Sequence, residues 1–369
     1  MLIAIDGNEA NVGQRVGVSV YTLNLLKYFQ KNANQETNFL IFLRNKPLAD
    51  LPKENLFFRY QVIPAKILWS QVFLPFHLFF KKNIDVFFAP AHYSPRFLKI
   101  PLVVTVHDLS YFYYPNEFLK TDLYKLSHWT QYSVKKAKKI IAVSETTKKD
   151  LITFYDLPED KIEVIYNGYE KKVKTQKSKT KNCLKNFKID PYKYILYVGT
   201  IQPRKNTEAL IRAFFKFKKD YPDFKLVVTG KKGWLYQEIF EIVKELKLEK
   251  EIVFTGYVDD KTLVILYQNA FCFVMPSLYE GFCLPLLEAM SNDCPVICSS
   301  APSLPEIGAD ACLYFDPKNI DELYNQLTAL KNDYQLKKEL IEKGKERVKS
   351  FSWENCAQET LTILKNAVL

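Results

Sequence analysis

Two carboxylates near the start of a predicted helix have the spacing that most directly suggests chemistry. Glu280 and Glu288 stand eight residues apart in SLYEGFCLPLLEAMS (277–291), where a helix is expected to begin near Leu284 or Pro285. Such carboxylates can accept hydrogen bonds from sugar hydroxyls, while the first backbone amides of the helix can bind a phosphate. The alternative is an ordinary surface helix that carries acidic residues.

Two adjacent cations form a second candidate. Arg204 and Lys205 lie in GTIQPRKN (199–206), between a strand-like run and a helix that we expect to begin near Thr207 with Asn206 as its N-cap. Positive side chains beside a helix N-terminus favour a diphosphate, because their charge adds to that of the helix dipole. A pair of cations on a solvated surface is the alternative.

A glycine-containing loop follows the first predicted strand. The segment DGNEANVGQRVGVSVY (6–21) contains Gly7, Gly13 and Gly17 ahead of a helix-like stretch. Glycines allow backbone amides to approach phosphate oxygens at a helix N-terminus. The spacing is not the G-x-G-x-x-G of dinucleotide sites, and a simple flexible loop is the alternative.

Three other segments also place polar residues directly after a predicted strand. His107 and Asp108 end the run LVVTVHD (102–108); a lone histidine is more often structural than catalytic, but this one ends a buried strand. GKKG (230–233) and GYVDD (256–260) could contact a phosphate or a nucleobase, or could be simple turns.

The elements that must position these residues alternate along both halves of the chain. Continuous apolar runs joined by helix-like stretches predict parallel strands buried on both faces, hence two doubly wound α/β sheets. Ligands of such sheets bind beyond the carboxyl ends of the strands. The strand-like runs are 2–6, 39–43, 85–90, 102–108, 139–144, 194–200, 225–230, 252–258, 272–277 and 295–300. The main helix-like stretches are 18–32, 121–139, 207–221, 236–247, 283–291, 333–349 and 353–367.

We therefore predict a first α/β domain over residues 1–170 and a second over 189–350, with a basic linker at 171–188 between them. The linker prediction depends on a lysine-rich sequence without apolar periodicity, and a basic contact surface is the alternative. Residues 351–369 are predicted to form a C-terminal helix that crosses back to the first domain.

Composition sets broad limits. The 369 residues are enough for about two domains, and 48% hydrophobic with 25% charged residues is ordinary globular usage. A net charge of +11 favours anionic ligands without choosing among nucleotides, lipid phosphates and nucleic acid.

The longest apolar run, Ile67 to Phe80, is too short to span a bilayer, and no signal peptide is expected at the N-terminus. The seven cysteines contain no C-x-x-C and are expected to be reduced core thiols of a cytosolic protein.

The segment EGFCLPLLEA resembles the signature of the family-4 retaining glycosyltransferases, whose GT-B fold has two Rossmann-like domains facing across a cleft. HDLSYFYYP and FAPAHYSP look most like the mannosyltransferase branch that builds bacterial O-polysaccharide. Further matches follow the order of the family over nearly the whole chain: GVSVY at 17–21, HD at 107–108, AVSE at 142–145, NG at 167–168, RKN at 204–206, PS at 276–277 and LPE at 304–306.

The resemblance assigns roles to five residues in particular. It implies that Arg204 and Lys205 hold the donor diphosphate and stabilise the leaving nucleotide, and that His107 contacts the reacting sugar. It also implies that Glu280 binds hydroxyls of the donor hexose and that Glu288 binds those of the nucleotide ribose.

Further donor contacts are implied around these. Gly17 should approach the diphosphate, although the family often has two adjacent glycines where this chain has Val16 and Gly17. Lys231 and Val258 should lie near the base. The remaining residues implied in donor binding are Thr200, Gly281, Phe282 and Leu284.

A mechanism follows from the charges. Breaking a sugar–phosphate bond develops negative charge on the diphosphate, which fixed cations stabilise more in the transition state than in the ground state. The chain contains no D-x-D triplet, so Arg204, Lys205 and the helix dipole are predicted to replace a metal ion, and no cofactor is expected. The family retains anomeric configuration, and attack on the leaving-group face is expected because no carboxylate is a compelling nucleophile.

We therefore predict retaining, metal-independent transfer of a hexose, with GDP-mannose as the preferred donor, to a glycan or lipid-linked glycan. A UDP-sugar-dependent glucosyl- or N-acetylhexosaminyltransferase is the first alternative. A related phosphorylase or epimerase, or a non-catalytic nucleotide or nucleic-acid module, are others. No cofactor lysine for a phosphorylase can be placed, and without a nucleic-acid motif no nucleic-acid partner is expected.

A basic run suggests a second partner. Lys135, Lys136, Lys138 and Lys139 follow an aromatic, partly amphipathic stretch at 121–134. Such a surface could dock on anionic lipid and reach a lipid-linked acceptor, or be a solvated basic face. We expect a cytoplasmic protein, with peripheral contact at the inner face of the plasma membrane as an open alternative.

Overall fold

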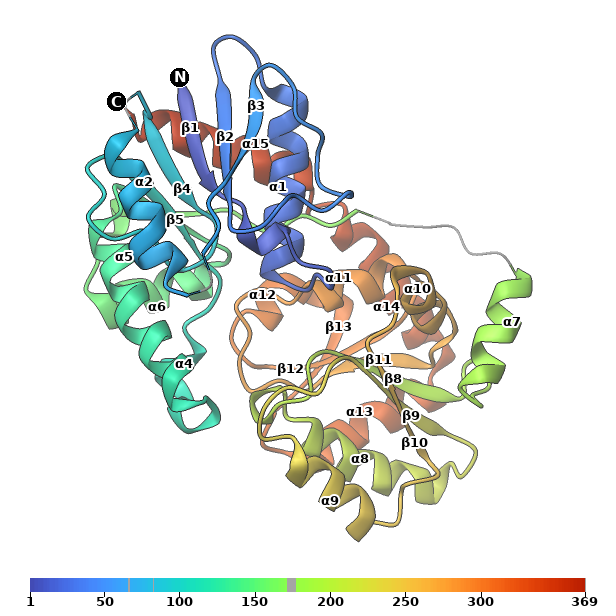
Figure 1. The fold of residues 1–369 in the computed structure, drawn as a ribbon. Helices are drawn as coiled ribbons and strands as arrows, with labels where there is room; N and C mark the ends of the chain where they lie inside the picture. The colour runs from blue at the N-terminus through green and yellow to red at the C-terminus, as the bar shows by residue number, and fades with distance from the viewer. Residues whose placement is uncertain (66, 82, 171–176, 369) are drawn as a thin grey trace. The chain divides into compact units, whose positions relative to one another are not determined.

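A computed structural model describes residues 1–65, 67–81, 83–170 and 177–368, and divides the chain into two α/β units. Each unit has one parallel sheet with helices on both faces (Figure 1), which confirms the two predicted doubly wound sheets. No helix of the described residues is long and apolar enough to cross a membrane. Unit 1 contains Met1–Pro115, Lys120–Gly168 and Phe351–Leu369, and unit 2 contains Asn116–Leu119 and Tyr169–Ser350.

The sheet of unit 1 has the order β3-β2-β1-β4-β5-β6-β7, and all its pairs are parallel. Its central strands β4 and β5 are buried at every residue, as expected of strands covered on both faces. The strands are β1 (Leu2–Asp6), β2 (Asn38–Leu43), β3 (Phe58–Val62), β4 (Val86–Ala89), β5 (Leu102–Val106), β6 (Lys139–Ala142) and β7 (Ile162–Val164).

The predicted helix at 121–139 is interrupted and ends early. It consists of α4 (Lys120–Tyr124), the π-helical η4 (Lys125–Trp129) and α5 (Thr130–Lys136), and Lys139 already belongs to β6. The helix ends because Ala137 leaves the helical region, with ψ 142°. The other helices of unit 1 are α1 (Val18–Asn32), η2 (Trp69–Phe73), α2 (Leu74–Phe80), α3 (Ser110–Tyr113), α6 (Glu145–Tyr155) and α15 (Trp353–Asn366), with short 3-10 turns η1 (Asn8–Ala10) and η5 (Glu159–Lys161). The 3-10 turn η3 (Pro115–Glu117) begins at the last residue of unit 1 before Asn116–Leu119, which belong to unit 2.

The sheet of unit 2 has the order β10-β9-β8-β11-β12-β13, again with parallel pairs. The strands are β8 (Tyr194–Val198), β9 (Lys225–Thr229), β10 (Ile252–Gly256), β11 (Cys272–Met275), β12 (Val296–Ser299) and β13 (Cys312–Phe315). The helices are α7 (Lys177–Asn186), η6 (Pro203–Lys205), α8 (Thr207–Asp220), α9 (Gln237–Glu245), α10 (Asp260–Asn269), α11 (Leu284–Ser291), α12 (Leu304–Gly308), η7 (Ala309–Ala311), α13 (Ile320–Asn332) and α14 (Tyr334–Val348).

The predicted linker at 171–188 differs from expectation in its second part. Residues 171–176 lie outside the described residues, and Lys177–Asn186 forms the helix α7 of unit 2. Within α7, Leu184 is buried, which gives the helix an apolar contact that the lysine-rich sequence obscures.

Three strands were not predicted from the sequence, and all three lie at the edge of a sheet. β3 and β7 are the outer strands of the first sheet and β13 is an outer strand of the second. Half-exposed or exposed residues interrupt each of them, so none has the continuous apolar run of a central strand.

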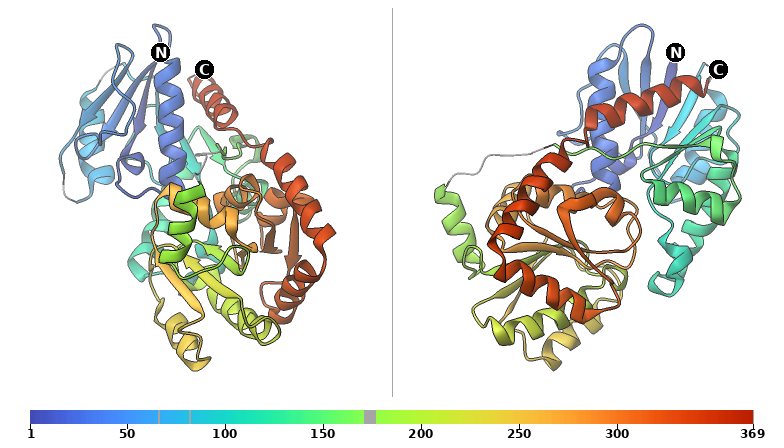
Figure 2. Two further views of the ribbon diagram at one scale, coloured as in Figure 1. Left: turned by 90° about the vertical axis from the view of Figure 1, so that its right-hand side faces the viewer. Right: turned by 180° about the vertical axis from the view of Figure 1, so that it is seen from behind.

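The C-terminal helix α15 packs on α1 within unit 1 (Figure 2). Cys356, Leu361 and Leu364 of α15 join the hydrophobic core of unit 1, and Gln358 accepts a hydrogen bond from the Tyr28 hydroxyl. The start of α15 passes against Gly168, where an added Cβ would overlap the backbone of residues 352–353.

We therefore expect Gly168→Ala to destabilise the protein by about 1–3 kcal/mol, because the added methyl displaces the backbone at the start of α15. Urea unfolding at equilibrium measures the change. Gly13→Ala is the matched control, since nothing lies within 4 Å of a Cβ at that position. Equal unfolding free energies for the two variants would contradict the packing described here.

Candidate active site

The strands β8 and β11 of unit 2 are neighbours although two other strands separate them in the sequence. The chain leaves them towards opposite edges of the sheet, and ligands of α/β sheets bind at the carboxyl ends of such a strand pair. The loop after β8 carries Arg204 and Lys205, and the loop after β11 carries Glu280. The Leu278 amide donates a hydrogen bond to the Arg204 carbonyl at 2.9 Å, which joins the two loops directly.

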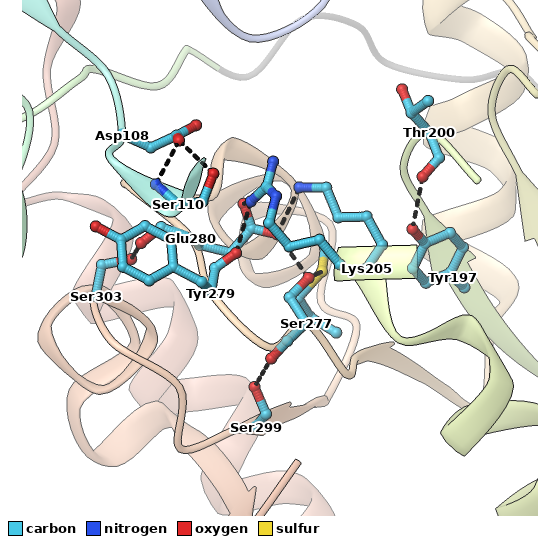
Figure 3. Close-up of polar contacts among 12 residues, drawn as sticks. Asp108, Ser110, Tyr197, Thr200, Lys205, Ser277, Tyr279, Glu280, Ser299 and Ser303 are labelled. Carbon is cyan, nitrogen blue, oxygen red and sulfur yellow. Dashed lines mark hydrogen bonds and ion pairs between the residues drawn. The ribbon is translucent and has the colours of Figure 1, made fainter. Parts of the chain in front are cut away.

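Glu280 is the centre of a charged cluster in these two loops (Figure 3). Its Oε1 lies 2.6 Å from Lys205 Nζ and accepts a hydrogen bond from Ser277 Oγ, also at 2.6 Å. Its Oε2 lies 3.9 Å from Arg204 Nη1, which donates a 2.7 Å hydrogen bond to the Tyr279 carbonyl. The structure thus brings Glu280 to two adjacent cations, although Lys205 and Glu280 are 75 positions apart in sequence.

The cluster is nearly removed from solvent. The side chains of Glu280, Arg204 and Lys205 are 9%, 10% and 16% exposed. Burial alone would raise the pKa of Glu280, but the charges of Lys205 and Arg204, with hydrogen bonds from Lys205 and Ser277, hold it below its usual value. With Glu280 ionised, the three side chains carry a net charge of one positive unit, and the site favours an anion.

Buried serines hold the backbone around the cluster. Ser299 Oγ donates to the Ser277 carbonyl at 2.6 Å, and Ser303 Oγ donates to the Glu280 carbonyl at 2.8 Å (Figure 3). All three serines are at most 2% exposed. They fix the loop after β11, so that the carboxylate of Glu280 is positioned before any ligand binds.

The prediction that Asn206 caps α8 is wrong. Asn206 is the residue before α8, as expected, but it has left-handed backbone with φ 53° and its side chain does not cap the helix. Its Nδ2 instead donates to the carbonyls of Pro276, at 3.1 Å, and Pro317, at 2.8 Å. Asn206 therefore links three loops rather than satisfying the first amides of α8.

Helix α11 begins at Leu284, as predicted, after a left-handed Cys283 with φ 77°. Gly281 and Phe282 in the preceding loop are buried, and Leu284 is half-buried. The first amides of any helix lack intrahelical acceptors, which suits this end of α11 to a phosphate. Glu288 lies further along α11, where its Oε2 accepts a 3.1 Å hydrogen bond from the Tyr267 hydroxyl.

Lys231 and Val258, predicted to lie near the base, and Thr200, predicted to contact the donor, follow neighbouring strands of the same sheet. Thr200 follows β8, Lys231 follows β9 and Val258 follows β10. The loops after β8 and β9 are joined, because the amide of Ile201 donates to the Lys231 carbonyl at 2.9 Å. Lys231 Nζ lies 5.5 Å from the centre of the Tyr257 ring, and the Thr200 carbonyl accepts a hydrogen bond from Tyr197 (Figure 3).

His107 is at the carboxyl end of β5 in unit 1 and is 9% exposed. Its Nε2 lies 2.7 Å from the Pro90 carbonyl, so Nε2 carries the proton and donates it. Burial, helped by the nearby His92, lowers the pKa of His107 to about 3. The ring is therefore neutral at physiological pH and suits a polar contact better than proton transfer.

Two other predicted residues of unit 1 have local structural roles. Asp108 Oδ1 accepts hydrogen bonds from the amide and hydroxyl of Ser110 at 3.0 and 2.6 Å (Figure 3). Gly17 precedes α1 with φ 47°, a backbone conformation that side chains disfavour, and is exposed. The structure places His107, Asp108 and Gly17 in unit 1 and the remaining predicted site residues in unit 2.

Some polar residues with evident roles were missed by the sequence analysis. The PS pair at 276–277 was noted without a role, and only the structure shows Ser277 bonded to Glu280. Ser303 left no signal, because its partner is a backbone carbonyl 23 residues away. Asp6 of unit 1 was also given no role from the sequence. Burial raises its pKa to about 6, although Asn8 donates two hydrogen bonds to its Oδ1.

Comparison with known proteins agrees with this fold. Residues 16–172 match the model of glycosyltransferase family 4, and residues 178–347 match that of glycosyl transferases group 1. The structure of Anabaena HepE in complex with UDP-glucose superposes with a TM-score of 0.77 at 18% identity, covering 99% of each chain. The fold is therefore that of the GT-B glycosyltransferases.

Two relatives of the chain are named as mannosyltransferases. The O-antigen chain mannosyltransferase B of Escherichia coli is 32% identical over 76% of this chain and 74% of the relative. The O-antigen chain mannosyltransferase RfbU of Salmonella typhimurium is 32% identical over 70% of this chain and 69% of the relative. The chain is a glycosyltransferase and belongs to the group 1 glycosyltransferases with a family-4 N-terminal domain, which confirms the resemblance.

Removing the charge of Glu280 should test the electrostatics of the cluster. We expect Glu280→Gln to lower the free energy of unfolding by about 3–5 kcal/mol at pH 7, because it takes a counter-charge from two buried cations. A lowered folded-state pKa stabilises the protein above the unfolded pKa of about 4.3, and this contribution disappears as the pH falls through the folded-state pKa.

The wild-type protein and Glu280→Gln should therefore converge in stability as the pH falls below about 4. Urea unfolding at a series of pH values gives the comparison. Glu342→Gln, at a surface carboxylate that pairs with Lys345, is the control and should leave the stability nearly unchanged. A Glu280→Gln variant as stable as the wild type at pH 7 would be incompatible with the cluster.

Proposed function

We propose that this glycosyltransferase moves a hexose from a nucleotide-diphosphate donor to a glycan or lipid-linked glycan, with retention of anomeric configuration and without a metal ion. The observation that carries the proposal is the buried Arg204–Glu280–Lys205 cluster at the carboxyl ends of β8 and β11. Its excess positive charge and its low exposure suit a diphosphate that becomes more negative as the sugar leaves.

Arg204 and Lys205 are assigned to the donor diphosphate. They lie directly before α8, a helix of 14 residues whose N-terminal dipole adds to their charge. Because the cations are held in place before the reaction, they require no reorganisation as charge develops on the leaving nucleotide. Backbone amides at the start of α11 are assigned to the same phosphates, and Gly17 is assigned a further phosphate contact.

Glu280 is assigned two roles. Its Oε1 holds Lys205 Nζ at 2.6 Å, which positions the cation, and its Oε2 is assigned to a hydroxyl of the donor hexose. Glu288 is assigned to the ribose hydroxyls. Lys231 and Val258 are assigned to the base, where they would decide which nucleotide is accepted.

The proposed step needs no general base from the protein. The acceptor hydroxyl attacks the anomeric carbon on the face that the diphosphate leaves, the carbon–oxygen bond to the phosphate breaks, and the hydroxyl proton passes to the departing phosphate oxygen. His107, neutral because its pKa is about 3, is assigned to a polar contact with the transferred sugar. The proposal that no metal ion takes part is supported by the absence of any D-x-D triplet from the sequence.

The proposed donor is GDP-mannose, supported by the names of the two mannosyltransferases that are 32% identical to the chain. A UDP-sugar donor remains the alternative to be compared with it. We place the reaction in the cytoplasm, supported by seven free thiols in the described chain, six of them buried.

Lys205→Ala should lower kcat by about 10²–10³-fold, as loss of one preorganised charge-stabilising donor does elsewhere. The assay is acceptor-dependent release of nucleoside diphosphate, with circular dichroism to show that the fold persists. Lys216→Ala is the control, because that lysine pairs with Asp321 on the surface of the same unit. Near-normal turnover of Lys205→Ala would remove the phosphate role.

GDP-mannose should raise the melting temperature more than UDP- or ADP-sugars do, and should do so in excess EDTA, because a bound ligand stabilises the folded state by mass action. The measurement needs no acceptor. A larger shift with a UDP-sugar would replace the proposed donor. A shift that EDTA abolishes and Mg²⁺ restores would reverse the assignment of a metal-free site.

A further inference from the structure

One face of unit 1 exposes large apolar side chains that nothing in the catalytic proposal uses. The α2 surface, as we call it, consists of seven side chains of segment 67–80, together with Phe97. Exposure of the seven ranges from 41% to 72%, and Phe97 is 84% exposed. The seven are Ile67, Leu68, Val72, Phe73, Phe76, Phe79 and Phe80.

The helical part of this surface is apolar on two sides. Leu74 and Leu78, four residues apart, are buried and attach α2 to unit 1. Phe73, Phe76 and Phe80 are spaced by three and four residues and so share another side, which faces solvent. A surface helix normally has one apolar face, and a second one needs an apolar partner outside the unit.

Backbone conformation also indicates that the surface is built rather than accidental. Phe97 and Leu68 have left-handed backbone, with φ 59° and 51°, which is unfavourable for bulky side chains. Phe97 is held there by a 2.9 Å hydrogen bond from its amide to the Tyr132 hydroxyl. Neither side chain gains burial in return, so the unit holds both residues in strained conformations while their side chains remain in solvent.

Cations adjoin the apolar side chains. Lys99 Nζ lies 5.0 Å from the centre of the Phe79 ring. Arg96 donates to Gln71 Oε1 at 2.8 Å and stacks 4.2 Å from the centre of the Tyr132 ring, so the loop around Phe97 is bonded to both η2 and α5. These contacts connect the loop around Phe97 to Tyr132 of α5.

The basic run at the end of α5 is smaller than the sequence suggested. Lys135, Lys136 and Lys138 are exposed, but Lys139 is half-buried in β6 and pairs with Glu163 at 3.0 Å. Segments 67–81, 91–101 and 130–139 contain no Asp or Glu, whereas residues 159–163, which contact Lys135 and Lys139, include Glu159, Asp160 and Glu163. The surface thus combines exposed aromatic side chains with lysines, of which Lys139 alone is paired with a carboxylate among those named here.

We propose that the α2 surface inserts its aromatic side chains into the headgroup region of an anionic lipid bilayer, with Lys99, Lys135, Lys136 and Lys138 contacting the lipid phosphates. The proposal deepens the lipid-linked acceptor of the proposed function by naming the surface that contacts the membrane. Exposed aromatics beside lysines are typical of interfacial helices. A second copy of the chain fits less well, because pairing would bring two basic surfaces together in a protein of net charge +11.

Vesicle flotation tests the surface without donor or acceptor. The wild-type protein should float with vesicles of phosphatidylcholine mixed with phosphatidylglycerol, and much less with phosphatidylcholine alone. The triple variant Phe76→Ser, Phe79→Ser, Phe80→Ser should bind the mixed vesicles at least about tenfold more weakly, because it loses most of the inserted apolar area. Lys135→Gln with Lys136→Gln should weaken binding about fivefold per lysine at low salt, and less at about 0.15 M.

The double variant Leu56→Ser, Tyr334→Ser is the control, since both side chains are exposed, at 69% and 80%, outside the α2 surface. It should float like the wild type, and so should Lys205→Ala, which separates membrane contact from sugar transfer. A wild-type protein that ignores mixed vesicles at low salt, or a triple variant that floats normally, overturns the proposal. The proposal is also overturned if the wild-type protein is a dimer that binds no vesicles and the triple variant is a monomer.

Discussion

The site of unit 2 depends on one electrostatic constraint, namely that a buried carboxylate must be compensated by cations. Glu280 is almost excluded from solvent, and an isolated charge there would cost several kcal/mol of solvation. Lys205 and Arg204 compensate that charge, and Ser277 satisfies part of its hydrogen-bonding capacity. Because two cations face one carboxylate, the cluster keeps an excess positive charge, which favours an anionic ligand.

The topology of the sheet places this cluster at the carboxyl ends of two adjacent strands, where ligands of α/β sheets bind. Cations and carboxylate come from loops that follow β8 and β11, which are adjacent strands from which the chain proceeds to opposite edges. Hydrogen bonds between the loops, such as Leu278 to Arg204 and Asn206 to Pro276, hold the charged side chains in fixed positions relative to one another. The same arrangement puts the two cations beside the N-terminus of α8, and both features favour an anionic ligand.

Unit 1 contributes a different chemistry. His107 is buried, bonded through Nε2 to a backbone carbonyl, and neutral, so it is held in place and suits a polar contact better than proton transfer. The outer surface of the same unit presents the aromatic side chains of α2 beside lysines. A transferase whose acceptor is attached to lipid would need both features, one at the carboxyl edge of a sheet and one on a helical surface.

The sequence by itself determined the α/β class, the central strands and the residue types of the site, because buried parallel strands need continuous apolar runs and phosphate chemistry needs cations near helix starts. It did not reveal the edge strands β3, β7 and β13, whose half-exposed residues break those runs. Only the tertiary structure decided that Lys205 bonds to Glu280, that Asn206 links loops instead of capping α8, and that Phe76 and Phe80 are exposed. These are contacts between distant segments, or exposures set by what packs nearby, and local residue patterns carry no information about either.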